Sequence, residues 1–201
     1  MTDHEKLWDQ RLGIQTAGRD DIQADQYHHP YEPTPYCVLE RLADSGFFGQ
    51  GDTVLDYGCG KGRVSFFLAH QTGATAIGIE YDARIYADAM KNRRQATAKV
   101  DFLLTRAEAY EVPPQVNRCY FFNPFSVEIL HTVLARIIES WYERPREIFL
   151  FFYYPDEAYI AHLMTLEELE FYDEIFCGDL FPGDDPRERI LIFQLPLYEI
   201  D

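Results

Sequence analysis

A glycine-rich turn after a short apolar run constrains the fold of this chain more than any other feature. The apolar run ends in Asp56, and Gly58, Gly60 and Gly62 follow at every second position. Glycine lacks a Cβ atom, so it permits positive φ angles and lets a ligand approach the backbone closely. The pattern predicts a strand, a tight turn and then a helix, as in an open α/β sheet.

A second apolar run, at residues 77–79, ends in Glu80 and is followed by Tyr81. Ligands of open α/β sheets lie beyond the carboxyl ends of the strands, and an acid there can hydrogen-bond the hydroxyl groups of a ribose. We therefore interpret the chain as an α/β protein that binds a nucleoside.

The spacing of the three glycines distinguishes two classes of nucleoside cofactor. A dinucleotide site requires the pattern G-x-G-x-x-G. This chain has G-x-G-x-G, and Arg63 stands where the third dinucleotide glycine belongs. Asp56 adds a carboxylate, which is unfavourable beside a pyrophosphate but favourable beside a cation. The pattern favours S-adenosylmethionine, which carries a sulfonium and an ammonium group, over NAD or NADP.

Four segments together resemble the class I, seven-stranded S-adenosylmethionine-dependent methyltransferases. They are the glycine turn, the run that ends in Glu80, the sequence C-Y-F-F-N-P-F at 119–125 and the sequence Y-E-P-T-P-Y at 31–36. The last is similar to the Pro-Thr-Pro loop of some small methyltransferases, including certain lysine-modifying ones. The resemblance implies a Rossmann-like, doubly wound, mostly parallel seven-stranded sheet with an antiparallel last strand and helices on both faces.

Apolar runs and helical periodicity alternate along the chain, as this fold requires. Helical spacing also precedes the first strand, between Val38 and Gly46. We expect strands near 53–57, 76–80, 100–104, 118–123, 147–154, 171–177 and 189–195, and helices near 62–71, 83–96, 127–142 and 156–164.

Composition fits one methyltransferase domain over residues 1–201. With 47% hydrophobic residues the chain can fill one core. We expect residues 1–45 to form a helical and loop segment that caps the site, and residues 46–201 to form the cofactor-binding sheet. No apolar run reaches the about 20 residues of a membrane span, and the first residues lack a signal-peptide stretch. Four widely spaced cysteines predict free thiols, no metal site and a cytoplasmic location.

The net charge of −16 bears on the methyl acceptor. An acidic protein repels a phosphate backbone, so a nucleic-acid substrate is disfavoured. The densest basic cluster, between Lys91 and Lys99, lies near the end of a predicted helix, where cations complement the helix dipole. A cationic acceptor, either a small-molecule amine or a protein side chain, suits the charge better. The oligomeric state is not indicated.

The family resemblance implies roles for the cofactor residues. The glycines would cradle the methionine and ribose portions, Asp56 would orient the loop amides and face the amino group, Glu80 would bind both ribose hydroxyls and Tyr81 would stack on adenine. Arg106 occupies the place of the acid with which the family reads the adenine amino group. The expected cofactor-binding residues are Thr34, Asp56, Gly58, Cys59, Gly60, Gly62, Arg63, Glu80, Tyr81, Ala107 and Glu108.

The sequence Asn123-Pro124-Phe125 resembles a shortened Asn-Pro-Pro-aromatic motif of amino-group methyltransferases. In that motif the Asn oxygen and a following backbone carbonyl accept hydrogen bonds from the target nitrogen. The aromatic ring packs on this nitrogen, and it also stabilises a methylammonium by cation–π attraction. The resemblance implies that these three residues are catalytic and that the acceptor is nitrogen. An ordinary turn at a strand end, where Asn and Pro are common, is the alternative.

Two histidines precede the Pro-Thr-Pro sequence. His28 or His29 could act as a general base if this segment folds over the cofactor, although a pair on a surface loop is the alternative. The other candidates for the cofactor or acceptor pocket, each of which could instead pack in the core, are Tyr31, Thr34, Tyr36, Tyr153 and Tyr154.

These observations predict an S-adenosylmethionine-dependent methyltransferase that acts on an amine. Methyl transfer is an in-line displacement, so positioning the nucleophile supplies most of the acceleration. A non-enzymatic module that binds the cofactor, or works through protein contacts, is the alternative. The intact glycines and both acids argue against lost binding, whereas the sequence does not exclude lost catalysis. An NAD(P)-dependent oxidoreductase fits the glycine spacing less well.

Overall fold

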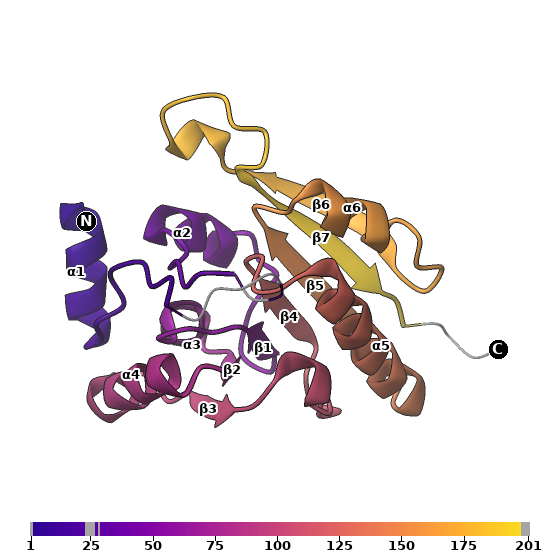
Figure 1. The fold of residues 1–201 in the computed structure, drawn as a ribbon, viewed down its shortest axis with the longest axis horizontal. Coiled ribbons are helices and arrows are strands. Elements are labelled where there is room, and N and C mark those ends of the chain that lie inside the picture. Colours follow the sequence, from indigo (N-terminus) through magenta and orange to yellow (C-terminus); the bar gives the residue numbers. More distant parts are fainter. Residues whose placement is uncertain (1, 23–26, 28, 198–201) are drawn as a thin grey trace.

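Seven strands form one sheet with helices on both faces (Figure 1). The structure is a computed structural model that describes residues 2–22, 27 and 29–197. The strands are β1 Thr53–Tyr57, β2 Thr75–Glu80, β3 Asp101–Leu104, β4 Arg118–Phe121, β5 Ile148–Tyr153, β6 Glu170–Phe176 and β7 Arg189–Leu195.

The strand order is β3-β2-β1-β4-β5-β7-β6. Strands β1 to β5 pair in parallel, and β7 runs antiparallel to both of its neighbours. Strands β1 and β5 are buried along their whole length, which is typical of parallel strands covered on both faces. The predicted fold class is therefore confirmed: a doubly wound, mostly parallel sheet whose last strand is antiparallel.

Six α-helices connect and cover the strands in the described part of the chain. None of them has the length and apolar character needed to cross a bilayer. They are α1 Asp3–Leu12, α2 Tyr36–Asp44, α3 Arg63–Thr72, α4 Ala83–Gln95, α5 Val127–Glu143 and α6 Glu157–Leu163, and the short 3₁₀ helices are η1 Ala107–Ala109 and η2 Gly178–Leu180.

The alternation of side chains along β5 divides the core into two layers. Phe149 and Phe151 face the layer that contains residues of α1, α2 and α3, whereas Leu150 and Phe152 face the layer that contains α5 and α6. Successive strand residues point to opposite faces, so a continuous apolar run fills both layers. The sheet is thereby fixed between two helical layers, and its carboxyl edge remains for a ligand.

Two strands end earlier than the sequence predicted, at the edge where a ligand would bind. The expected strands 118–123 and 147–154 stop short of Asn123 and Tyr154, which have positive φ angles of 38° and 53°. These are left-handed backbone conformations, which non-glycine residues adopt rarely and which interrupt an extended strand. The chain therefore turns sharply just above β4 and β5.

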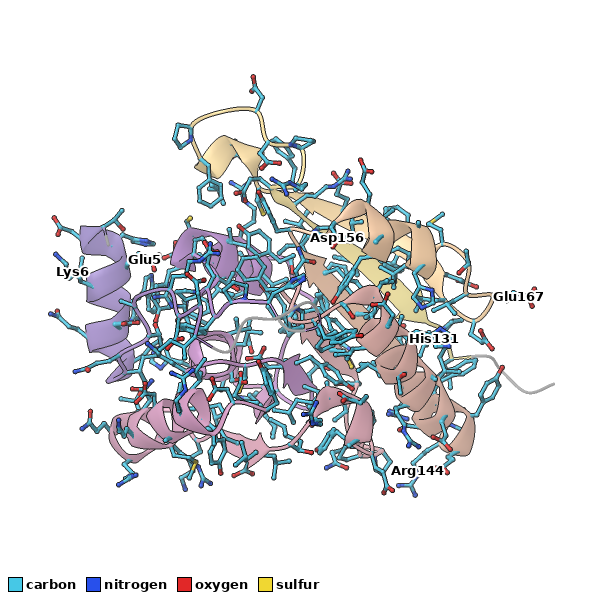
Figure 2. The ribbon with its side chains drawn as sticks, viewed as in Figure 1. Glu5, Lys6, His131, Arg144, Asp156 and Glu167 are labelled. Atoms are coloured by element: carbon cyan, nitrogen blue, oxygen red, sulfur yellow. The ribbon has the colours of Figure 1, made fainter. Side chains whose placement is uncertain are left out.

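The N-terminal helix packs on the same layer as α2 and α3. The ring of Trp8 lies edge-on to Phe67, with centroids 4.8 Å apart, and stacks on Tyr36 at 5.8 Å. Glu5 lies on the side of α1 toward α2, whereas Lys6 points away (Figure 2). A Glu5 carboxylate oxygen accepts a hydrogen bond from the Tyr36 N–H at 2.9 Å. Thus α1 is attached to the sheet layer by both apolar and polar contacts.

Candidate active site

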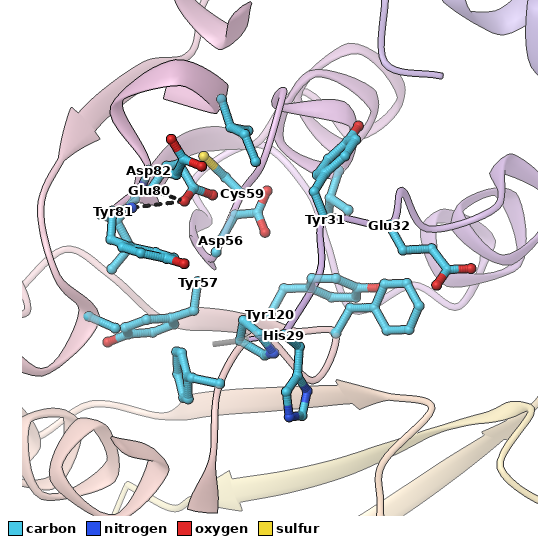
Figure 3. A pocket seen from close by; sticks show the side chains of 18 of the residues that line it. His29, Tyr31, Glu32, Asp56, Tyr57, Cys59, Glu80, Tyr81, Asp82 and Tyr120 are labelled. Carbon is cyan, nitrogen blue, oxygen red and sulfur yellow. Dashed lines mark hydrogen bonds between the residues drawn. The ribbon is translucent and has the colours of Figure 1, made fainter. Parts of the chain in front are cut away.

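A pocket opens at the carboxyl ends of β1, β2 and β4, with about 980 Å³ of empty space that is partly continuous with solvent (Figure 3). The strand order reverses between β1 and β4, because β2 and β3 lie on one side and the later strands on the other. Open α/β sheets bind ligands at such a switch point. Eleven of the fourteen residues predicted for the site line this pocket: Thr34, Asp56, Gly58, Cys59, Arg63, Glu80, Tyr81, Ala107, Glu108, Pro124 and Phe125.

The Glu80 carboxylate holds the backbone at the end of the pocket that the sequence predicted to bind the cofactor, named here the cofactor end. Its Oε1 accepts hydrogen bonds from the N–H groups of Tyr81 and Asp82, both at 2.9 Å, and its Oε2 accepts one from Gly60 at 3.0 Å. Glu80 is only 6% exposed, and this burial raises the pKa of its carboxyl while the three N–H donors oppose the rise. A carboxylate oxygen accepts about two hydrogen bonds, so Oε2 retains one position for a ligand. A single hydroxyl contact fits this arrangement, rather than the predicted contact to both ribose hydroxyls.

Asp56 lies beside Glu80 but has a different partner. The hydroxyl of Ser65, in the first turn of α3, donates to Oδ2 at 2.6 Å. Asp56 is 2% exposed, and burial raises the pKa of its carboxyl to about 7. The prediction that Asp56 orients the glycine-loop amides is corrected here, because the Gly60 N–H donates to Glu80 instead. Asp56 is a buried carboxyl that faces the pocket and would gain charge stabilisation from a cation.

Of the three loop glycines, only Gly58 lies in the pocket wall. Its φ is +69°, and a Cβ atom there would stand 2.5 Å from Pro124 Cβ. A Cβ on Gly60 would overlap the ring of Tyr31, and one on Gly62 would collide with Phe102 at 2.5 Å. The prediction that all three cradle the ligand therefore needs correction. Side chains from distant segments cover the second and third glycines.

Arg63 lines the pocket, but its guanidinium group binds the N-terminal part of the chain. Its Nε donates to the Thr16 hydroxyl at 2.7 Å, and its Nη1 donates to a Glu5 carboxylate and to the Thr34 carbonyl. The guanidinium carbon also lies 4.3 Å from the centroid of the Tyr36 ring. Arg63 is 3% exposed, and a buried cation requires such partners. Its predicted role at the cofactor becomes one of attaching α1 and α2 to α3.

The side of the pocket that the sequence predicted to bind adenine is lined by Tyr81, Ile85, Ala107 and Glu108. Arg106 also lines it, and its guanidinium lies 3.7 Å from the Glu108 carboxylate. Glu108 is thus close to Arg106, the residue that stands where the family has an acid. This region is formed by the turn after β3 and by the start of α4.

Residues 29–34, named here the cover segment, cross the other side of the pocket. The Tyr31 hydroxyl donates to the Thr16 carbonyl at 2.5 Å, and the Tyr31 backbone pairs with Asp20 in an isolated antiparallel bridge. The buried Thr34 hydroxyl lies 3.0 Å from the Tyr120 hydroxyl. Figure 3 shows Tyr31 across the pocket from Asp56 and Glu80. The cover segment is therefore a wall of the pocket that is fixed to the sheet by hydrogen bonds.

The loop after β4 contains the three residues predicted to be catalytic. Pro124 and Phe125 line the pocket, but Asn123 does not: its side-chain nitrogen donates to the Tyr154 carbonyl at 2.5 Å. The carbonyl oxygens of Asn123 and Pro124 both face His29, whose Nδ1 lies 2.7 Å from the first and whose backbone N–H donates to the second at 3.3 Å. The cover segment thus contacts the backbone carbonyls of this loop, residues 122–126, which is named here the acceptor loop after its predicted role. His28 lies outside the described residues.

Three tyrosines named from the sequence have packing roles. Tyr36 is buried and donates its hydroxyl to Asp9 at 2.6 Å. Tyr153 is buried and donates to Glu188 at 2.7 Å, and Tyr154 donates to Asp185 at 2.6 Å. None of the three lines the pocket.

The structure adds pocket residues that sequence reasoning missed. Asp82 follows Glu80 closely and accepts from the Arg84 N–H at 2.8 Å as the N-cap of α4, a pattern that is visible in the sequence. Tyr120 and Phe122 alternate along the fourth apolar run, so the period of a strand could have placed them on one face. Asp20 reaches the pocket through its bridge to Tyr31, and no local signal indicates this.

The strand order and the pocket at the switch point agree with the methyltransferase fold that the sequence predicted. Residues 54–143 match the family described as "Methyltransferase domain". Two solved structures share the fold. A SAM-dependent methyltransferase from Aquifex aeolicus has a TM-score of 0.60 at 14% identity, with 79% of this chain and 89% of that one covered. A tRNA (uracil-54, C5)-methyltransferase of Pyrococcus abyssi, in complex with S-adenosyl-L-homocysteine, has a TM-score of 0.55 at 14% identity, covering 79% and 36%.

A curated relative provides a match in sequence. It is a protein-lysine N-methyltransferase of Saccharolobus islandicus (strain REY15A), 35% identical over 66 residues, which are 32% of this chain and 41% of the relative. The match thus spans less than half of that relative's length. This match and the match to the methyltransferase domain each cover less than half of this chain, which shares its fold with a SAM-dependent methyltransferase.

Proposed function

We propose that this chain is an S-adenosylmethionine-dependent methyltransferase that acts on an amine nitrogen. The observation that carries this proposal is the pair of buried carboxyls, Asp56 and Glu80, on the adjacent strands β1 and β2. They face a pocket whose opposite side is formed by the acceptor loop and the cover segment. A nucleoside with a cationic end matches this pair of acids.

The residues of the pocket fit this cofactor. Asp56 would attract the ammonium group, and the open position on Glu80 Oε2 would accept from a ribose hydroxyl. Tyr81, Ile85 and Ala107 offer an apolar surface for adenine. When bound, the cofactor supplies an electrophilic methyl group on a sulfonium. We further propose that residues 1–45 cap this site, because the cover segment belongs to them.

The acceptor loop supports a nitrogen nucleophile. Displacement at the methyl carbon requires the nucleophile to be held close and in line with the breaking bond. Pro124, which lies next to Gly58, and Phe125 line the pocket. The carbonyls of Asn123 and Pro124 each accept one hydrogen bond from His29, and each keeps a second lone pair that suits an amine. The ring of Phe125 would stabilise a methylammonium.

A protein lysine is the acceptor that we propose first. The curated relative is a protein-lysine N-methyltransferase, and the net charge of −16 attracts cationic side chains. RNA is the second candidate, because a structural neighbour is a tRNA methyltransferase. The same net charge opposes RNA binding, since phosphates are repelled.

Calorimetric titration tests the cofactor, with S-adenosylmethionine and S-adenosylhomocysteine as ligands and NAD and NADP as controls. We expect micromolar binding of the two adenosyl ligands alone. Transfer of a tritiated methyl group to poly-L-lysine, free lysine and bulk tRNA then tests the acceptor, with Asp56→Asn as the variant of matched size. We expect the wild type to label poly-L-lysine and Asp56→Asn not to label it.

Other outcomes of these two assays are equally informative. Labelling of tRNA alone would replace the amine assignment with a nucleic-acid one. Cofactor binding without transfer to any of these acceptors would favour the non-enzymatic module. Binding of NAD would contradict the interpretation of the glycine spacing.

A further inference from the structure

One ring nitrogen of His29, Nδ1, is hydrogen-bonded to the acceptor loop. Nδ1 lies 2.7 Å from the Asn123 carbonyl oxygen, and the backbone N–H of the same residue donates to the Pro124 carbonyl. A further bond, from the Ser126 N–H to the Tyr27 carbonyl at 2.8 Å, holds the chain just before the cover segment on this loop. The ring is therefore fixed at the pocket wall by contacts between residues 94 positions apart.

This hydrogen bond determines which ring nitrogen is free. A carbonyl oxygen can only accept, so Nδ1 must carry the proton that it donates to Asn123. In the neutral imidazole the other nitrogen, Nε2, then has a lone pair. Nε2 makes no hydrogen bond to any residue within 2–22, 27 and 29–197. The acceptor loop thus holds the ring in the tautomer that a base requires.

The surroundings of His29 favour it over the acids of the pocket as a base. The Glu80 carboxylate accepts hydrogen bonds from three backbone N–H groups, and the Asp56 carboxylate accepts one from the Ser65 hydroxyl. Glu32 has an ion pair with Arg19 at 3.4 Å. Other charged groups of the wall are held by ion pairs: Asp20 and Asp82 bind Arg84, Glu108 lies by Arg106, and Arg63 binds Glu5. Burial raises the pKa of Tyr31, Tyr57, Cys59 and Tyr120.

His29 also lies on the acceptor side of the pocket. Tyr120, Phe122 and Pro124 line the same side, and Figure 3 shows His29 beside Tyr120 and apart from the Asp56–Glu80 pair. The side chain is exposed, so a proton that it takes up can pass to solvent. A base is needed here because an ammonium group has no lone pair with which to attack a methyl carbon.

We propose that His29 Nε2 removes a proton from the acceptor ammonium group. The N–H bond breaks and its electron pair becomes the lone pair of the amine, while the proton forms a new N–H bond on His29. The amine nitrogen then bonds to the methyl carbon as the carbon–sulfur bond breaks, and its electron pair goes to sulfur. The products are a methylammonium, a neutral thioether and a histidinium that loses its proton to water. This role rests on the proposed amine methylation.

Nitrogen NMR of the full chain, labelled with ¹⁵N-histidine, tests the tautomer without any assay of activity. The His29 signals are identified by their loss in His29→Gln. We expect the neutral ring to carry its proton on Nδ1 and a lone pair on Nε2, both with and without S-adenosylhomocysteine. A neutral ring with its proton on Nε2 would overturn the proposal, because the proposed base would lack a lone pair.

Chemical rescue tests the catalytic role. His29→Ala should lower methyl transfer to poly-L-lysine by about 10²-fold or more, the usual range for loss of a general base. Added imidazole should restore at least a tenth of the rate, whereas 1,2,4-triazole, a ring of the same size but a far weaker base, should not. Equal restoration by both rings would indicate a merely structural role. An unchanged rate in His29→Ala would also refute the proposal.

Matched variants separate this proposal from the function on which it rests. His70→Gln, at the end of α3 and outside the pocket wall, should retain the wild-type rate, and His29→Gln replaces His29→Ala if the latter fails to fold. S-adenosylhomocysteine should bind both position-29 variants within about threefold of the wild type, as measured by calorimetry. If the wild type methylates lysine and the His29 variants do so at the same rate, only the role of His29 as a base is refuted. If the wild type methylates no amine, both this role and the proposed amine methylation are refuted.

Discussion

The two ends of the pocket are built in different ways. At the cofactor end, Glu80 binds backbone amides of residues 60, 81 and 82, which belong to adjoining turns. At the acceptor end, the cover segment contacts the acceptor loop across 94 positions of sequence, through His29 and Asn123. The first end is fixed by short motifs on neighbouring strands, whereas the second forms only once distant parts of the chain meet. The two ends should therefore respond separately to substitution.

Replacing Glu80 should have the largest effect, because it disrupts the cofactor end as a whole. Glu80→Ala leaves three backbone N–H groups without their acceptor, and each unsatisfied group costs about 1–3 kcal/mol. We expect the free energy of unfolding to fall by about 3 kcal/mol or more and binding of S-adenosylhomocysteine to weaken at least a hundredfold. Urea denaturation and calorimetry measure the two. Glu108→Gln in the same pocket is the control, and equal behaviour of both variants would contradict the distinct role of Glu80.

Replacing Asn123 should disturb the acceptor end alone. Asn123→Ala removes the side-chain hydrogen bond to Tyr154 that holds the loop after β4. Methyl transfer to poly-L-lysine should fall about 10²-fold, since a small misplacement of the acceptor is enough to slow an in-line displacement. Affinity for S-adenosylhomocysteine should stay within about threefold. A large loss of cofactor affinity would mean that the two ends are not independent.

The pH dependence of cofactor binding should distinguish the ends further. Burial raises the pKa of Asp56 from 3.8 to about 7, so the carboxyl takes up a proton as pH falls through that value. The ammonium group of the cofactor favours the charged form, and affinity should therefore drop about tenfold from pH 8 to pH 6. Asp56→Asn should abolish this slope. A slope that persists in the variant would assign the proton to another group.

The same carboxyl predicts how the stability of the unliganded protein changes with pH. The folded-state pKa of Asp56 lies above its unfolded value of 3.8, so the folded state binds the proton more tightly. The contribution of Asp56 therefore favours the folded state at low pH and is lost as pH rises through about 7. Asp56→Asn should remove this trend, as urea denaturation at pH 5 and pH 8 would report.

The smallest expected effect concerns the contact between the cover segment and the glycine loop. Tyr31→Phe keeps the ring over Gly60 but removes the hydrogen bond to the Thr16 carbonyl. One such bond contributes about 0.5–1.5 kcal/mol, so cofactor affinity should fall only about threefold. Tyr154→Phe, which loses a comparable bond to Asp185 outside the pocket, should leave affinity unchanged. Similar losses in both variants would indicate a general effect on stability.

The comparison also explains what the sequence could predict. Apolar runs located all seven strands, and the acids at 56 and 80 were placed in the pocket because parallel strands end at a common edge. The strand ends at Asn123 and Tyr154 were missed, since left-handed backbone there is set by the loop contacts and not by residue type. Local periodicity thus sufficed for the sheet and for the cofactor acids.

Side-chain directions after the glycine turn could not be predicted. Gly60 is covered because Tyr31 reaches it from another segment, and Arg63 turns from the ligand because acids of α1 lie within reach. Both outcomes depend on tertiary contacts, for which a single sequence gives no periodic signal. The sequence named His28 or His29 as a possible base, but it could not show the contact of His29 with the acceptor loop.

The buried guanidinium of Arg63 also links two distant parts of the chain, both during folding and during evolution. During synthesis, Glu5 and Asp9 emerge first and must wait for Arg63, more than fifty residues later, before α1 can settle on the sheet. Over evolution, a relative that lost α1 would keep the buried Arg63 guanidinium without its carboxylate partners. Relatives without this helix should therefore have replaced the arginine after the glycine loop, so that the two features are inherited or lost together.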